Sequence, residues 1–300
     1  MIKLSNGHCF EYMAASGALA FDGKGWIWEV PLKWLGLINP LLFTVVIKTL
    51  TLQPRRGNLR WYNPFRCVRF LKGGIVNAVG LTNPGINWWC QRIGPRINLK
   101  GPPLIGSILG EPNELVELAK MLNGYPLVGL EINASCPNTT EDILTNIGRV
   151  IASCEAVKKV SRFPLLLKFS VVHDFLKIVP KVQGLIEAFS INSVPWNLVF
   201  PGQESPLAKF GGGGVSGKIV QPYTWKMVGK LSVISSIPVI GPSVWDFEDI
   251  ATLRQFGASA ISFGSVFIPY PWRPTLFAKR DQSQLTKRKE LAHDSAAAER

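Results

Sequence analysis

Short apolar runs of strand length alternate with longer stretches of helical periodicity along most of the 300-residue chain. Several runs lack the polar alternation of a one-sided sheet, as expected for parallel strands buried on both faces. Eight strand-then-helix units in a chain of this length predict an α/β fold, a (β/α)₈ or TIM barrel forming a single domain over residues 1–300. The predicted strands are Leu41–Thr49, Ile75–Val79, Leu104–Ile108, Leu127–Ala134, Leu165–Ser170, Phe189–Ser193, Val239–Gly241 and Ala260–Val266.

Three of the intervening helices have clear boundary signals. Segment 111–124 begins with a proline and acidic residues, repeats apolar residues at helical spacing and closes on a glycine. A Thr-rich cap begins the helix predicted over 139–160, and the helix predicted over 246–257 starts at an aspartate and stops at a glycine. The Gly- and Pro-rich segment 195–217 is expected to be an active-site loop, and the basic tail 278–300 an exposed helix or frayed end.

Composition and charge narrow the class of protein. Apolar residues make up 47% of the chain and charged residues 18%, which excludes a disordered chain. The formal net charge of +13 predicts a surface that attracts anions, either nucleic acid or a small phosphorylated ligand. Net charge alone does not separate these two ligands, although no repeat of aromatic and basic residues supports nucleic-acid recognition.

No segment predicts a membrane span or a disulfide framework. The apolar stretch Leu35–Ile47 is interrupted by Asn39 and Pro40 and is shorter than the ~20 residues that a spanning helix needs. The amino terminus lacks the apolar run of a secretory signal, so a cytoplasmic protein is expected. Five cysteines with no CxxC pair suggest neither disulfides nor a metal site.

Polar residues stand at several predicted strand ends, where a barrel places its chemistry. A lysine within an apolar run such as VVIKTLTL or PLLLKF needs an anionic partner or must reach water, because an unpaired buried ammonium is costly. The two interpretations are evenly balanced for either lysine alone, but two lysines beside three asparagines favour a polar ligand pocket. These residues are Lys48, Asn77, Asn133, Lys168 and Asn192.

One cysteine and two glycine clusters are further candidates. Cys136 lies in the polar loop ASCPNT, where a thiol can serve as a general base or nucleophile if its pKa is tuned toward neutrality, although a lone cysteine is more often inert. No partner histidine is evident, since His173 stands either at the edge of the site or in solvent. Glycines in 211–218 and 263–265 would let backbone N–H groups approach a phosphate.

Several segments together resemble the dihydroorotate dehydrogenase family, with a likeness that spans residues 12–270. The most specific are INASCPN (132–138) and NAVGLTNPG (77–85), supported by IKTLTLQPRRGN (47–58) and LLLKFS (165–170). The resemblance implies an FMN-containing (β/α)₈ flavoprotein, an oxidoreductase that oxidises dihydroorotate to orotate in pyrimidine biosynthesis. Cysteine in ASCPN is typical of the soluble class of the family, whereas the membrane-associated class has serine.

The resemblance also implies roles for individual residues. Cys136 would be the catalytic base that takes a proton from C5 of dihydroorotate while a hydride passes from C6 to N5 of FMN. Lys168 would lie beside the pyrimidine ring of the flavin, where its charge stabilises the reduced anion. The implied substrate-binding residues are Lys48, Asn77, Gly80, Leu81, Asn133, Asn138, Asn192 and Ser193. The implied FMN-binding residues are Ser16, Lys48, Thr49, Asn133, Lys168, Ile191, Gly217, Gly241, Gly264 and Ser265.

One departure from the family concerns the cofactor. After Ile240 the family usually has a glycine pair in the phosphate loop, whereas this sequence reads GPSVWD, in which Pro242 has no N–H to donate. Either a small shift of the loop or the hydroxyl of Ser243 would have to compensate.

Partners and alternatives stay open at this point. A homodimer is expected from the resemblance, and the electron acceptor is fumarate, a quinone, or NAD through a separate iron–sulfur partner. One alternative is a related flavin oxidoreductase that acts on another pyrimidine or cyclic amide. The other is a barrel without flavin that serves as a binding protein.

Overall fold

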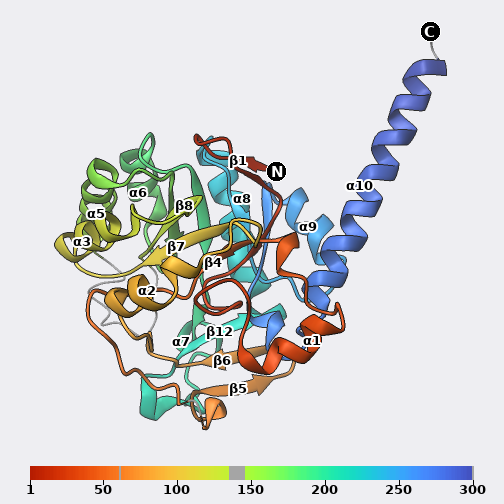
Figure 1. Cartoon of the computed structure of the whole chain (residues 1–300). Helices are drawn as coiled ribbons and strands as arrows, with labels where there is room; N and C mark the ends of the chain where they lie inside the picture. Colours follow the sequence, from red (N-terminus) through yellow and green to blue (C-terminus); the bar gives the residue numbers. More distant parts are fainter. Residues whose placement is uncertain (61, 135–145, 299–300) are drawn as a thin grey trace.

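The computed structural model describes residues 1–60, 62–134 and 146–298, and a sheet of eight parallel strands forms its centre (Figure 1). An isolated parallel bridge between Phe189 and Val239 joins the two edges of the sheet, which closes it into a barrel. The predicted (β/α)₈ architecture is confirmed. In sheet order the strands are β10 (Ala188–Ile191), β9 (Leu165–Phe169), β8 (Gly129–Asn133), β7 (Leu104–Ile108), β4 (Thr44–Val46), β3 (Tyr12–Ala14), β14 (Ala260–Phe263) and β13 (Ile240–Gly241).

One of the eight predicted barrel strands is wrong. The run Ile75–Val79 lies outside the barrel, in β6 (Gly74–Asn77), and the barrel takes β3 instead. β3 has only three residues, all buried, which is too short for a periodicity signal. The run at β6 is apolar because Ile75 and Val76 fill small cores of a second sheet.

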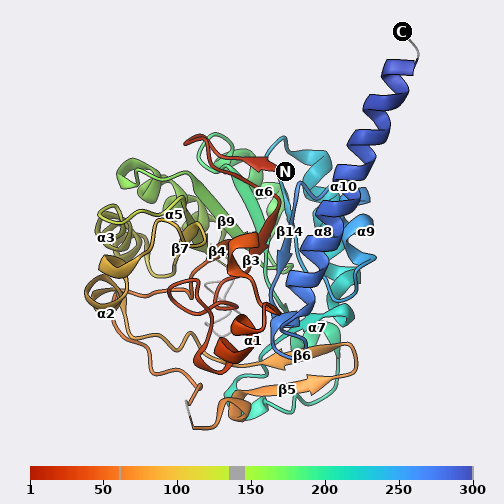
Figure 2. The same ribbon diagram turned by 45° about the vertical axis from the view of Figure 1, so that its right-hand side comes forward.

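This second sheet is antiparallel and lies across one end of the barrel, together with α1 (Val30–Trp34), in both views (Figures 1 and 2). Hairpin β5–β6 turns at Lys72 and Gly73, and the φ of +79° at Gly73 is one that glycine adopts at no steric cost. Segment 195–217 contains α7 (Trp196–Val199) and β12. The strand order is β11 (Val194–Pro195), β12 (Gly214–Gly217), β6 and β5 (Val68–Leu71).

Helices pack around the outside of the barrel, and their caps explain most of their boundaries. The helix predicted over 111–124 is confirmed as α3, in which Glu114 accepts a hydrogen bond from the N–H of Glu111 at 2.8 Å. The main outer helices are α2 (Ile86–Arg92), α3 (Pro112–Leu122), α5 (Ile147–Val160), α6 (Phe175–Val182), α8 (Gln221–Ile234) and α9 (Asp249–Gln255).

One helix begins later than its sequence predicts, and the predicted start of another cannot be compared with the described residues. α5 starts after Asn146, whose side chain accepts from the N–H of Arg149 at 2.9 Å, and the predicted start over 139–145 lies outside the described residues. α9 starts at Asp249 and not at Asp246, because the Asp249 carboxylate accepts the Asp246 N–H and draws the preceding loop into a turn.

The carboxyl-terminal helix α10 (Arg273–Ala298) begins against the barrel and points away from it in both views (Figures 1 and 2). Asp281 anchors it, since this buried carboxylate accepts the hydroxyl of Tyr12 and pairs with Arg254 at 2.6 and 2.8 Å. The basic segment expected to be a tail is therefore helical as far as the structure describes it, and it is tied to the barrel near its start.

Candidate active site

A cavity of about 740 Å³ lies between the carboxyl ends of the barrel strands and the second sheet. Most residues that the family resemblance implies line it, although they come from eight of the fourteen strands in the described residues and the loops that follow them. Parallel strands place their carboxyl ends at one end of a barrel, which is why positions so far apart in sequence meet here. The implied residues that line the cavity are Ser16, Lys48, Thr49, Asn77, Leu81, Asn133, Lys168, Ile191, Asn192, Ser193, Gly217, Gly264 and Ser265.

Four implied residues do not appear in this lining. Cys136 and Asn138 lie outside the described residues. Gly80 precedes the lining residue Leu81, and its φ of +69° belongs to the left-handed region. Gly241 is buried behind the cavity, where a Cβ would come within 2.8 Å of Ala258. The absence of a side chain at Gly241 therefore lets β13 pack closely against Ala258 and against Leu253 of α9.

Lys168 has the anionic partner that its apolar surroundings require. Its Nζ lies 3.4 Å from Oε1 of Glu131, whose side chain is 0% exposed. Ser107 donates to Oε1 of this carboxylate at 3.1 Å, and Ser190 donates to Oε2 at 3.0 Å. Both carboxylate oxygens are thus engaged, as a buried charge demands. The sequence analysis missed Glu131, although a glutamate in the buried strand GLEIN is the signal that marks it.

A chain of hydroxyl groups joins this carboxylate to the cavity wall. The Ser107 hydroxyl lies 2.9 Å from that of Thr49, which in turn lies 2.9 Å from the hydroxyl of Ser16. Asn133 donates its amide to Thr49 Oγ1 at 3.1 Å. These contacts fix the orientation of the Asn133 amide, so the donor and acceptor atoms at this wall are held in place before any ligand arrives.

Aromatic side chains form the opposite wall and the rim of the cavity. Trp26 and Trp28 stack with ring centroids 5.1 Å apart and planes 3° from parallel, and Trp26 donates its Nε1–H to the carbonyl of Gly17 at 3.0 Å. Phe70 of β5 and Phe65, in the 3₁₀ turn just before that strand, also line the cavity. Flat apolar walls suit a planar ring system. No periodic pattern marked these residues, because they stand on short elements.

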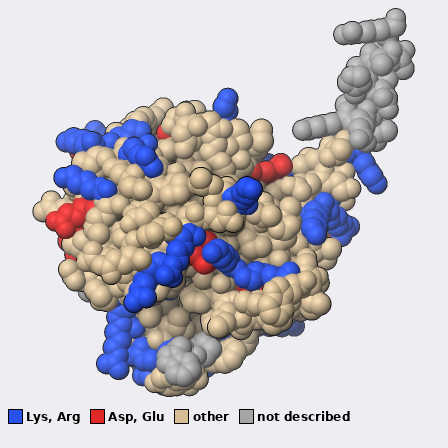
Figure 3. Space-filling model, viewed as in Figure 1, with Lys and Arg blue, Asp and Glu red and all other residues tan. Residues whose placement is uncertain are grey.

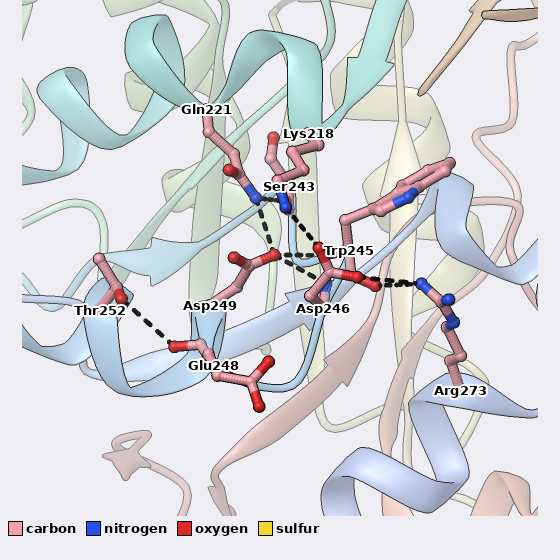
Figure 4. A network of polar contacts seen from close by, with 9 residues as sticks. All are labelled: Lys218, Gln221, Ser243, Trp245, Asp246, Glu248, Asp249, Thr252 and Arg273. Carbon is pink, nitrogen blue, oxygen red and sulfur yellow. Dashed lines mark hydrogen bonds and ion pairs between the residues drawn. The ribbon is translucent and has the colours of Figure 1, made fainter. Parts of the chain in front are cut away.

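The loop that replaces the glycine pair is held in shape by one buried carboxylate. Oδ2 of Asp249 accepts three hydrogen bonds at 2.8 Å, from the N–H groups of Trp245 and Asp246 and from the amide of Gln221 (Figure 4). Gln221 also donates to the carbonyl of Ser243 at 3.0 Å. Lys218 and Arg273 pair with Asp246 at 2.6 and 3.3 Å and tie the loop to β12 and α10.

The same loop presents possible donors for an anion. Ser243 has a φ of +66°, the left-handed conformation that a glycine would adopt more readily, and its hydroxyl accepts from Thr224 at 3.2 Å. Within the ranges that the structure describes, no hydrogen bond engages the backbone N–H of Ser243, Val244, Gly264 or Ser265, and all four residues line the cavity. Pro242 thus removes one donor but leaves others. The net charge of +13 and the basic side chains spread over the face in Figure 3 favour an anionic ligand.

The remaining titratable groups are poor candidates for the base. Burial raises the pKa of Cys154 to about 12 and also raises that of Cys67 and Cys90, which keeps these thiols protonated. His173 is buried and not in solvent, and desolvation lowers its pKa. Its Nδ1 accepts the N–H of Ser170 at 3.0 Å, and it does not line the cavity.

A cavity at the carboxyl ends of barrel strands, with anion donors at the last two strands, is typical of barrels that bind phosphorylated ligands. Known proteins define the class further. The sequence profile of dihydroorotate dehydrogenase matches residues 35–272. The catalytic subunit of dihydroorotate dehydrogenase B (NAD(+)) from Geobacillus kaustophilus is 31% identical over 282 residues, which cover 89% of this chain and 84% of the relative. Its counterpart from Desulforudis audaxviator is 30% identical over 284 residues, covering 92% and 88%.

Solved structures agree with the fold. The DHODH from Eimeria tenella in complex with ferulenol superposes with a TM-score of 0.70 at 16% identity, covering 94% of this chain and 82% of that one. The chain belongs to the dihydroorotate dehydrogenase family. Among the described residues, no helix is both long and apolar enough to cross a bilayer.

Proposed function

We propose that this protein oxidises dihydroorotate to orotate with FMN as its cofactor, as a step of pyrimidine biosynthesis. The observation that carries the proposal is the single cavity in which Lys168, Lys48 and the strand-end asparagines meet a set of unengaged backbone donors. Family membership supports the same activity.

The residues present fit FMN at both of its ends. The N–H groups after β13 and β14, at Ser243, Val244, Gly264 and Ser265, would hold the phosphate, and the Asp249 brace keeps the first two in place. Lys168 would face the pyrimidine end of the ring system. Bound FMN supplies the two-electron acceptor that the side chains themselves lack.

Substrate recognition falls to groups that can read a planar ring of donors and acceptors. The amides of Asn77, Asn133 and Asn192 each offer both a donor and an acceptor, and Lys48 offers a cation for the carboxylate of dihydroorotate. We propose Asn138, Gly80, Leu81 and Ser193 as further contacts around the substrate. The stacked tryptophans and Thr49 would keep bulk water from the rings.

Cys136 is proposed as the general base that removes the C5 proton. The thiols of Cys67, Cys90 and Cys154 are held protonated by burial, so they do not compete for this role. A cysteine base requires a thiolate near neutral pH, and the cations Lys48 and Lys168 in the cavity lining would supply positive potential that favours one.

The electron acceptor is proposed to be NAD⁺, reached through a second subunit. The relatives named above are catalytic subunits of NAD(+)-dependent enzymes, which supports this choice over fumarate or a quinone. We further propose a cytoplasmic homodimer of this chain that does not bind nucleic acid.

A visible absorption spectrum of the purified protein tests the proposal. We expect a yellow protein whose flavin band bleaches when dihydroorotate is added anaerobically, and little bleaching with dihydrouracil. Faster bleaching with dihydrouracil would favour the alternative cyclic-amide substrate, and a colourless protein that FMN does not reconstitute would favour the binding protein. The Cys136→Ala variant should keep its colour and lose most of the bleaching rate.

A further inference from the structure

Glu131 lies beneath the floor of the cavity and does not line it. It stands two positions before Asn133 on β8, so both side chains point to the same side of the sheet, into the barrel. The strand register places Ser107 of β7 beside Glu131 and Ser190 of β10 beside Lys168. Glu131 is therefore surrounded by polar groups from three neighbouring strands.

The ion pair with Lys168 is an unusual use of barrel core space. Removing a carboxylate and an ammonium from water costs several kcal/mol for each ion, and well-packed apolar residues are often as stable. Stability alone does not account for the pair. Lys168 also lines the cavity, whereas Glu131 is fully covered, so the ammonium lies between the carboxylate and the space that a ligand would fill.

We infer that Glu131 is a positioning residue that sets how much positive charge Lys168 presents to the flavin, and thereby sets the reduction potential of the bound flavin. The inference rests on the proposed function. A reduced flavin is anionic, so a free ammonium beside it favours reduction. A carboxylate 3.4 Å behind that ammonium opposes part of its field and fixes where the ammonium lies.

The Glu131→Gln variant tests this directly. Glutamine keeps the shape: its carbonyl oxygen accepts from one of Ser107 and Ser190 and its amide donates to the hydroxyl of the other, but it leaves the Lys168 charge uncompensated. We expect the variant to bind reduced flavin about tenfold more tightly relative to oxidised flavin, a rise of about 30 mV in the midpoint potential of a two-electron couple. Glu187→Gln is the matched control, because this residue is partly exposed and bonded to Ser5 away from the cavity.

A double-mutant cycle shows whether the effect passes through the lysine. Lys168→Met should lower the potential, since the cation is gone. In that background Glu131 has no ammonium to act through, so adding Glu131→Gln should change the potential far less than it does in the wild type. A purely structural role for Glu131 would lower thermal stability without this dependence on the lysine.

The outcomes separate the inference from the function on which it rests. A wild-type protein that binds no flavin refutes the proposed function. A flavoprotein that oxidises dihydroorotate but has the same potential in wild type and Glu131→Gln refutes the inference alone. If Glu131→Gln does not fold, Glu131→Asp keeps the charge and withdraws it from Lys168. A smaller rise in potential is then expected, and an unchanged or lower one overturns the inference.

Discussion

Asp249 holds the phosphate-side loop by one oxygen atom, and its replacement by alanine should loosen that loop. The residue is 8% exposed, and Oδ2 accepts from Trp245, Asp246 and Gln221, each at 2.8 Å. A hydrogen bond to a charged group contributes about 1.5–3 kcal/mol. The bond from the Asp246 N–H is only part-buried, so water can replace it. The other two bonds then give a loss of about 3–6 kcal/mol in the free energy of unfolding.

Urea unfolding of the apoprotein measures this loss, because the midpoint falls while the slope stays constant if only stability has changed. Glu248→Ala is the control, since its carbonyl accepts from Thr252 but its carboxylate has no hydrogen bond in the described structure (Figure 4). The stabilisation gained from excess FMN should also be smaller in Asp249→Ala, because a loosened loop binds the phosphate less tightly. The reasoning fails if Asp249→Ala is within about 0.5 kcal/mol of Glu248→Ala, the range of ordinary surface substitutions.

Three further predictions concern other parts of the molecule. Gly217→Ala should cost about 2–5 kcal/mol in urea unfolding, because its φ is +104° and a Cβ would lie 2.7 Å from Gly74. The control Gly211→Ala has a φ of +83° but open space around it, and it should cost only about 1–2 kcal/mol. Equal losses in the two variants would contradict the crowding at Gly217. Asp281→Ala should cost about 2–3 kcal/mol, because the Tyr12 hydroxyl loses its acceptor and the partly buried Arg254 keeps only Glu11 as an anionic partner, and an unchanged melting temperature would refute its anchoring role. Burial lowers the pKa of His173 in the folded protein, so as the pH falls this histidine binds a proton in the unfolded chain before it does in the folded one. The free energy of unfolding should therefore decrease as the pH falls below about 6.5. That slope should flatten in His173→Asn, and if it flattens only in His8→Gln, the other histidine with a lowered pKa is responsible.

The barrel was predictable from the sequence because buried apolar runs of strand length recur between predicted helices. The prediction of an individual strand was wrong where no such run marks it. β3 contributes only Tyr12, Met13 and Ala14, which are too few for any pattern. The run in β6 is as apolar as a barrel strand, and only its antiparallel partners distinguish it. A hydrophobic pattern reports burial and does not report which sheet a strand joins.

Site residues were predictable from the sequence where burying their charge in an apolar run would cost free energy. Lys168 drew attention because an ammonium in PLLLKF is expensive, and the structure supplies the partner that the argument required. Glu131 carries the same cost in GLEIN and was passed over. Trp26 and Trp28 incur no such cost, so neither charge nor periodicity could place them at the cavity.

The position of β3 between β14 and β4 has a consequence for how the chain is made. Tyr12 pairs with Ile261, so the first barrel strand to leave the ribosome waits for the last one. During synthesis the backbone donors and acceptors on that side of β3 remain unsatisfied, and an unpaired strand edge is prone to join a wrong neighbour. A nascent chain of this protein should therefore engage chaperones until its final strand has emerged.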